Sequence, residues 1–195
     1  MGSLPYIVLL GDVGSGKSTI VEKLTGVSGR SSAVPLSKTV TAEVFESYDR
    51  SFIICDTPGS NAMSEKIQHN IEISHALNSY PVTCVLIIVK ADTRMDNVLK
   101  DVRKYADGFL PQDIPAELIG VCITHMDNVQ WTGHNFLPHL ESQLGINTAV
   151  FSNLKTPRES LRADIMRIIV GKRPIPMNID SNMFLRLFKI GNNNL

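Results

Sequence analysis

Residues Leu9–Val21 read LLGDVGSGKSTIV, and this stretch decides the fold. It begins in an apolar run typical of a buried strand, passes through a glycine-rich turn to Lys17, and then resumes an apolar rhythm. The turn from Gly11 to Ser18 fits G-x-x-x-x-G-K-[ST], between a predicted strand and a predicted helix. Its glycines let main-chain N–H groups converge on phosphate oxygens, and the N-terminus of the helix offers its positive dipole end to the same negative charge. The turn is therefore predicted to hold phosphate groups.

The motif assigns roles within this turn. Lys17 is expected to reach the outer phosphates and Ser18 to hold Mg²⁺. The motif by itself leaves ATP and GTP open. The residues expected to touch the nucleotide here are Asp12, Val13, Gly14, Ser15, Gly16, Lys17, Ser18 and Thr19.

Strands and helices are predicted to alternate on the C-terminal side of the turn. The predicted strands are 6–10, 40–48, 51–55, 82–89, 118–124 and 148–151, and the predicted helices are 17–25, 64–77, 93–106, 132–144 and 157–170. Several strands are near-continuous Val, Ile and Leu, which requires a sheet covered on both faces. Residues 40–55 have the pattern of a β-hairpin. We predict a three-layer α/β P-loop NTPase fold, with a mostly parallel six-stranded sheet, one antiparallel edge strand and helices on both faces.

The composition is that of an ordinary globular domain. Of 195 residues, 43% are hydrophobic and 19% charged, and the formal net charge is zero, so the bulk charge carries no nucleic-acid signal. The strongest apolar run, Val85–Val89, is far shorter than the ~20 residues of a membrane-spanning helix. The N-terminus lacks the pattern of a secretory signal, which favours a cytoplasmic protein.

The cysteines and histidines do not form a metal-binding pattern. Cys55, Cys84 and Cys122 lie far apart inside apolar runs and are expected to be buried thiols in a reducing compartment. Four histidines likewise lack ligand spacing and are expected to be surface or capping residues: His69, His75, His134 and His139.

A second constellation, Asp56-Thr57-Pro58-Gly59, follows an apolar strand. Asp56 is expected to emerge at the carboxyl edge of the sheet beside the phosphate turn, where it can hold Mg²⁺ through water. The Gly59 amide is then free to approach a γ-phosphate. The alternative is an ordinary β-turn, which these residue types also favour.

A third constellation, Thr124-His125-Met126-Asp127, follows the fifth predicted strand. A carboxylate placed there can accept hydrogen bonds from both N–H donors of a guanine edge. Adenine presents the opposite pattern, so the Asp127 charge would have no hydrogen-bond donor to pair with when ATP is bound. Asp127 would therefore select GTP.

In this order and spacing, GDVGSGKS, DTPG and THMD resemble the G1, G3 and G4 motifs of a translation-factor-class GTPase domain, over about Tyr6–Gly171. Thr-His-x-Asp is similar to the immunity-associated GTPases (GIMAP) and their Toc and septin relatives, which implies that His125 packs on the guanine. VFSNLKT is similar to their G5 segment, which implies that Ser152 and Asn153 line the base pocket. The extra helices and extensions of those families are missing or shortened here.

The residues around the γ-phosphate are less defined. TVTAEV resembles the T-x-T-x-x-C run of the GIMAP group, which favours Thr41 as a Mg²⁺ ligand, with Thr39 as the alternative and ordinary strand threonines as a third reading. Ser60 stands where Ras-like proteins have the glutamine that orients water, so slow hydrolysis is expected. Arg30 is either an arginine finger or a solvated loop residue. The resemblance implies activation by a partner or by homodimerisation across the nucleotide face.

The helix pattern divides the chain into a predicted G domain, residues 1–171, and a C-terminal extension, residues 172–195, because Gly171 closes the last apolar helix stripe. A short amphipathic run lies between Asn182 and Ile190. It is expected to dock on its own domain or, alternatively, to bind a partner or a membrane surface.

Taken together, the motifs favour a GTP-hydrolysing switch with GTP or GDP as ligand and Mg²⁺ as cofactor, in which Lys17, Thr41 and Gly59 are the predicted catalytic residues at the γ-phosphate. One alternative is a GTP-dependent assembly module that does not hydrolyse GTP, which Ser60 favours. Another is an ATP-using P-loop kinase, against which Asp127 argues. The effector and the activating protein are not defined by the sequence.

Overall fold

The computed structural model describes residues 3–29, 41–59, 66–108, 110 and 114–179. Its centre is a six-stranded sheet in the order β2-β3-β1-β4-β5-β6, in which only β2 and β3 pair antiparallel. This confirms the predicted α/β fold and its antiparallel edge strand. The strands are β1 (Tyr6–Leu10), β2 (Glu43–Glu46), β3 (Ile53–Asp56), β4 (Cys84–Lys90), β5 (Ile119–Thr124) and β6 (Ala149–Phe151).

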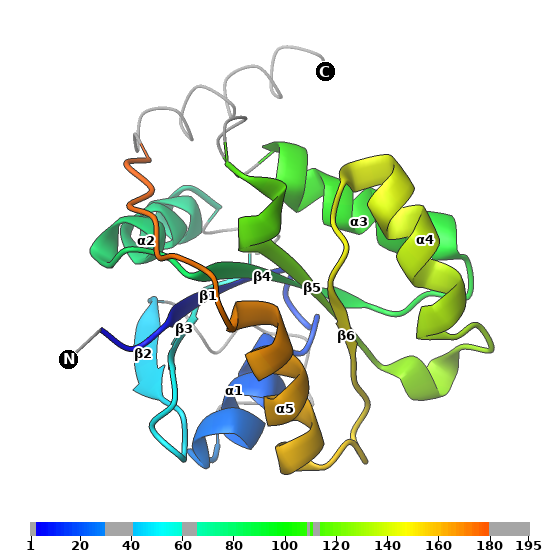
Figure 1. Cartoon of the computed structure of the whole chain (residues 1–195), viewed down its shortest axis with the longest axis horizontal. Helices are drawn as coiled ribbons and strands as arrows, with labels where there is room; N and C mark the ends of the chain where they lie inside the picture. The colour runs from blue at the N-terminus through cyan, green and yellow to red at the C-terminus, as the bar shows by residue number, and fades with distance from the viewer. Residues whose placement is uncertain (1–2, 30–40, 60–65, 109, 111–113, 180–195) are drawn as a thin grey trace.

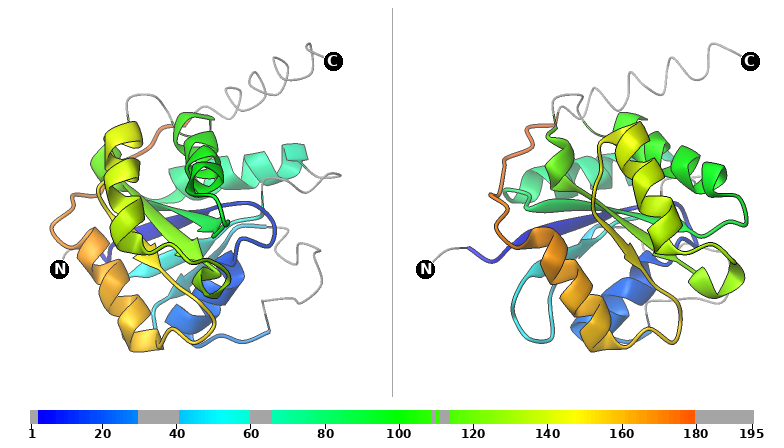
Figure 2. Two further views of the ribbon diagram at one scale, coloured as in Figure 1. Left: turned by 90° about the vertical axis from the view of Figure 1, so that its right-hand side faces the viewer. Right: turned by 45° about the vertical axis from the view of Figure 1, so that its right-hand side comes forward.

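Helices cover both faces of the sheet, as Figures 1 and 2 show. In Figure 1, α2, α3 and α4 lie above the sheet, and α1 and α5 lie below it. Short 3₁₀ turns flank β5 at Ala116–Leu118 and Met126–Asn128. The α-helices are α1 (Lys17–Thr25), α2 (Lys66–Ser79), α3 (Met95–Gly108), α4 (Gly133–Leu144) and α5 (Arg158–Ile169).

The apolar strands explain why two layers of helices are needed. Side chains alternate across β1, so Val8 and Leu10 enter the core under α2, α3 and α4, while Ile7 and Leu9 enter the core formed with α1 and α5. All five β1 residues are buried. Because apolar side chains lie on both faces of these strands, exposure of either face to water is unfavourable, and both faces must be covered by helices.

The hairpin is shorter than predicted. Glu43–Glu46 pairs with Ile53–Asp56, and most of β2 is exposed, as suits an edge strand. The turn is closed by the Asp49 carboxylate, which accepts hydrogen bonds from Ser47 and Ser51. Val40, the predicted start of the strand, lies outside the described residues.

The chain beyond Gly171 continues to pack on the domain. In Figure 1 this segment runs from α5 past the sheet toward α2. Ile175 forms an antiparallel bridge with Val82, and the Asn78 side chain bonds both main-chain groups of Ile179. Met177 and Ile179 are buried in the core under α2. The run between Asn182 and Ile190 lies outside the described residues.

The three cysteines are buried and not disulfide-bonded, as predicted. Burial raises the pKa of Cys55 and Cys84 to about 11 and that of Cys122 to about 12. These thiols are therefore poor nucleophiles. No helix in the described part of the chain is long and apolar enough to cross a membrane.

Candidate functional site

The glycine-rich turn joins the end of β1 to the start of α1 at the carboxyl edge of the sheet. Gly14 and Gly16 have φ angles of 79° and 98°, in the left-handed region that favours glycine. Gly16 is the N-cap of α1, and a Cβ on it would lie 3.2 Å from the Thr124 side chain. The turn thus needs glycine both for its backbone and for its close approach to β5. It presents the open N-terminus of α1, a site suited to an anion.

Lys17 is held inside this turn. Its side chain is 6% exposed, and Nζ donates hydrogen bonds to the carbonyl oxygens of Gly11 at 2.9 Å and Asp12 at 3.0 Å. Burial lowers the pKa of Lys17 to about 8, against the opposing attraction of Asp56 and Asp12. An ammonium group with this environment is poised to pair with a bound anion.

Ser18 and Asp56 meet beside the turn. The Ser18 hydroxyl donates to Asp56 Oδ2 at 3.1 Å, and Asp56 is fully buried at the end of β3, next to β1 in the sheet. Hydroxyl and carboxylate oxygens are the ligands that Mg²⁺ prefers. No group of three His, Cys, Asp or Glu suited to a metal occurs in the described ranges. Mg²⁺ is usually bound by only one or two protein oxygens together with phosphate oxygens and water, and Ser18 and Asp56 fit that pattern.

The Asp56–Gly59 segment lies directly on the phosphate turn. The Thr57 hydroxyl donates to the carbonyl oxygen of Leu9, at the end of β1. A Cβ on Gly59 would lie 2.5–2.8 Å from atoms of Val13, so only glycine fits between the two loops. The predicted Asp-Thr-Pro-Gly element and the phosphate turn are thus brought into contact.

The expectation that all four histidines are surface or capping residues is wrong for His69. His69 is fully buried on α2, and its Nδ1 lies 2.9 Å from the carbonyl oxygen of Gly59. His75, His134 and His139 are exposed, as expected. The sequence signal for His69 was weak, because its partner lies ten residues earlier, before α2 begins.

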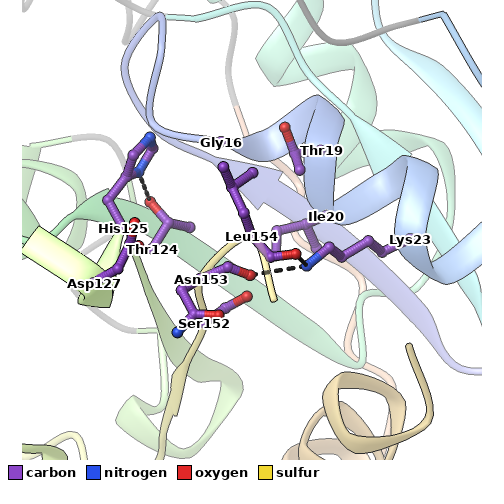
Figure 3. Close-up of a pocket in the computed structure, with 10 residues that line it drawn as sticks. All are labelled: Gly16, Thr19, Ile20, Lys23, Thr124, His125, Asp127, Ser152, Asn153 and Leu154. Atoms are coloured by element: carbon purple, nitrogen blue, oxygen red, sulfur yellow. Dashed lines mark hydrogen bonds between the residues drawn. The ribbon is translucent and has the colours of Figure 1, made fainter. Parts of the chain in front are cut away.

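A pocket lies on the other side of the phosphate turn, where β5 and β6 end next to each other (Figure 3). It is lined by Thr124, His125 and Asp127 of the third constellation and by Ser152 and Asn153 of the G5 resemblance. The lining residues are Gly16, Thr19, Ile20, Lys23, Thr124, His125, Asp127, Ser152, Asn153 and Leu154.

Thr124 and His125 connect this pocket to the phosphate turn. The Thr124 hydroxyl donates to the Ser15 carbonyl oxygen at 2.7 Å and lies 2.8 Å from His125 Nδ1. His125 has a φ of 57°, which turns its side chain out of the strand direction. Burial and nearby Lys90 lower the pKa of His125, against the attraction of Asp127. The lowered pKa favours the neutral imidazole, which is suited to stack on a planar ligand.

Three lining residues of the pocket, Ile20, Lys23 and Leu154, were not predicted from the sequence. Lys23 of α1 donates hydrogen bonds to three carbonyl oxygens of the β6–α5 loop, those of Asn153 at 2.8 Å and of Leu154 and Thr156 at 3.1 Å. Leu154 is 77% exposed although it is apolar and lines the pocket. Lys23 looks like any lysine of an amphipathic helix, so only its position in the fold reveals the contact.

Of the residues predicted near the γ-phosphate, only Thr41 is among those that the structure describes apart from Lys17 and Gly59. Thr41 is exposed just before β2. Arg30, Thr39 and Ser60 lie outside the described residues.

A family model described as 50S ribosome-binding GTPase matches residues 6–120, from β1 to the start of β5. The chain belongs to this GTPase family. The match spans the phosphate turn and the Asp56–Gly59 segment. No curated protein sequence matches this GTPase. The finer resemblance to the GIMAP, Toc and septin group, and to the translation-factor class, stays a prediction.

Solved structures share the fold of this GTPase. An NFeoB variant from S. thermophilus bound to GDP·AlF₄⁻ is similar with a TM-score of 0.65 and 16% identity, covering 98% of this chain and 81% of that chain. Another S. thermophilus NFeoB variant, bound to GMPPNP, has a TM-score of 0.64 and 17% identity, with coverage of 98% and 80%. An Era variant from Aquifex aeolicus bound to GDP·AlF₄⁻ has a TM-score of 0.60 and 19% identity, with coverage of 91% and 61%.

Proposed function

We propose that this G domain binds GTP and GDP with Mg²⁺ and hydrolyses GTP slowly as a molecular switch. The observation that carries the proposal is the Thr124 hydroxyl bonded to Ser15, which joins the phosphate turn and the pocket beside Asp127 into one continuous site. The guanine nucleotides in the similar solved structures, GDP·AlF₄⁻ and GMPPNP, support the same ligand class.

In this proposal the base lies in the pocket of Figure 3. The Asp127 carboxylate accepts hydrogen bonds from the N1–H and the exocyclic amine of guanine. The neutral imidazole of His125 packs on one face of the ring. Ser152 and Asn153 line the edge of the pocket, and Leu154 supplies an apolar contact.

The triphosphate lies over the glycine-rich turn. Main-chain amides of residues 12–19 and the Lys17 ammonium hold it, and Ser18, Asp56 and Thr41, with Thr39 as the alternative to Thr41, would hold Mg²⁺. When bound, the ion would neutralise charge on the phosphates. In this proposal the Gly59 amide senses the γ-phosphate, which is supported by the contact of the Gly59 carbonyl oxygen with His69 Nδ1.

The hydrolysis step separates two candidate functions. Ser60 occupies the position of the water-orienting glutamine, so the proposed hydrolysis is slow and is raised by a partner, or by a homodimer that meets across the nucleotide face and places Arg30 in trans. The same serine favours the second candidate, an assembly module that binds GTP without hydrolysing it.

Two measurements test the proposal. Nucleotide extracted from the purified protein is expected to be guanine nucleotide, and adenine nucleotide there would overturn the ligand assignment. Single-turnover hydrolysis of bound GTP, measured over a range of protein concentrations, is expected to be slow and to rise with concentration. A rate equal to that of GTP in buffer would leave the assembly module as the function, and a flat specific activity would remove the dimer.

Replacement of Lys23 with alanine is expected to weaken GDP and GTP binding about tenfold, because three carbonyl oxygens of the base-binding loop lose their common donor. Titration with a fluorescent guanine nucleotide measures the effect. Lys155→Ala removes the same charge from an exposed position in the same loop and is the matched control. Equal affinities for the two variants would contradict the role of Lys23.

Replacement of Ser18 with alanine is expected to lower GTP affinity about ten- to 100-fold in magnesium buffer. Substitutions of residues that support a metal ion commonly cost this much, and the alanine removes the hydroxyl that is proposed to hold Mg²⁺. In EDTA the variant and the wild type are expected to bind equally, because the hydroxyl then has no ion to hold. Ser28→Ala, which removes an exposed hydroxyl just beyond α1, is the control. A loss of the same size in EDTA would show that Ser18 does not act through magnesium.

A further inference from the structure

The phosphate turn carries an acidic side chain that reaches across to α3. Asp12 occupies the first variable position of the motif, and its Oδ1 lies 2.6 Å from Lys104 Nζ. The same oxygen accepts a hydrogen bond from the Tyr105 hydroxyl. These partners come from 92 and 93 residues further along the chain. Tyr105 is 1% exposed, so its ring is anchored in the core and its hydroxyl is held in place.

A carboxylate at this position works against phosphate binding. The main-chain oxygen of Asp12 accepts a hydrogen bond from Lys17, so the residue belongs to the cradle itself. Asp12 also lines a hollow beside the turn together with Val13, Gly14 and Ser15. A negative charge on a residue of the cradle repels a polyphosphate that is bound there.

A second carboxylate lies on the same side of the turn. Asp101, one turn before Lys104 on α3, lines a hollow together with Asp12, Lys90 and Tyr105. Burial raises the pKa of Asp101, and the Asp12 charge raises it further. Lys104 is thus a cation that offsets acidic charge placed directly behind the phosphate turn.

We propose that Lys104, supported by Tyr105, is a positioning residue of the phosphate turn that neutralises Asp12 and holds its carboxylate toward α3, away from the bound phosphates. The inference rests on the proposed function, because it needs a polyphosphate in the turn. The ion pair contributes little to folding, since Lys104 and Asp12 are 35% and 30% exposed and solvent screens the pair. Its contribution is to ligand affinity.

The test is a double-mutant cycle on Asp12 and Lys104 in which nucleotide affinity is measured. Dissociation constants for GMP, GDP and a non-hydrolysable GTP analogue are measured for wild type, Lys104→Ala, Asp12→Asn and the double variant. Lys104→Gln, which keeps much of the aliphatic stem, is measured beside Lys104→Ala, and thermal unfolding verifies that each protein is folded. Arg103→Ala is the matched control, because Arg103 is exposed on the same helix and faces Asp107 and Gln143.

Lys104→Ala and Lys104→Gln are expected to weaken binding of the GTP analogue about tenfold, with a smaller effect on GDP and the smallest on GMP, because the repulsion grows with ligand charge. Asp12→Asn keeps an acceptor for both partners and is expected to tighten binding. The double variant is expected to return to within about twofold of wild type, since both charges are then absent.

Two outcomes overturn the proposal while leaving the proposed function intact. One is that Lys104→Ala binds nucleotide as tightly as Arg103→Ala. The other is that Asp12→Asn does not rescue Lys104→Ala, which would show a loss of structure rather than of charge balance. A wild-type protein that binds none of the guanine nucleotides would overturn the proposed function, and this inference with it.

Discussion

Replacement of Asp127 with asparagine is expected to lower the affinity for GTP and GDP about 1,000-fold or more and to create affinity for xanthosine nucleotides. A carboxylate accepts hydrogen bonds from both N–H groups of the guanine edge, whereas an asparagine offers one acceptor and one donor. Guanine then leaves an amine facing an amide donor, and unpaired polar groups of this kind account for large discrimination factors between ligands. Xanthine carries a carbonyl where guanine carries the amine, so it fits the new pattern.

The change is measured by letting GTP, XTP and ATP each compete with a bound fluorescent nucleotide for the site. Asp107→Asn makes the same chemical change at the exposed end of α3 and is expected to leave the preference for guanine intact. If Asp127→Asn kept the wild-type preference for GTP over XTP and ATP, the base would not be read by this carboxylate, and the proposed guanine specificity would have to be abandoned.

Replacement of Lys17 with methionine is expected to abolish measurable triphosphate binding while stabilising the nucleotide-free protein. The ammonium is the buried cation of the phosphate turn, so its loss removes the main attraction for the outer phosphates. Without a ligand, however, burial of this charge is unfavourable, as its pKa of about 8 indicates. An apolar side chain of similar length is expected to raise the free energy of unfolding by about 1–3 kcal/mol at pH 7.

The pH dependence of stability identifies the cause. Since the folded pKa of Lys17 is about 8 and the ordinary value is 10.5, the unfolded chain retains a proton between these values that the folded protein has released. The free energy of unfolding contributed by Lys17 therefore rises with pH across this window. The three buried thiols act in the opposite direction above pH 9.0, because burial raises their pKa.

Denaturant unfolding of wild type and Lys17→Met, without nucleotide and between pH 7 and 10.5, isolates the Lys17 contribution as the difference between the two curves. The stability advantage of the variant is expected to be largest at pH 7 and to shrink above pH 8. An advantage that does not change with pH would mean that the buried charge is not its source. Retention of GTP binding by Lys17→Met would contradict the assignment of the phosphate turn.

The sequence by itself determined the central layer of the molecule. β1 and α1 begin and end at the predicted residues, because a fully apolar strand and a glycine-rich turn are local signals that no distant contact needs to complete. The apolar strands also predicted a mostly parallel sheet, and with it the positions of Asp56 and Asp127 at the ends of β3 and β5, since parallel strands end at the same edge. Within the described residues, the other element ends either match the prediction or differ from it by at most three residues, as expected where the last turn or pair depends on neighbours.

Only the tertiary structure decided which side chains support the site. Lys23 meets carbonyl oxygens 130 to 133 residues away, Lys104 meets Asp12 across 92 residues, and His69 is turned into the core toward Gly59. None of these residues differs in type or spacing from an ordinary helix residue. Their roles follow from which helix face packs against which loop, and that is settled by the folding of the whole chain around two hydrophobic cores.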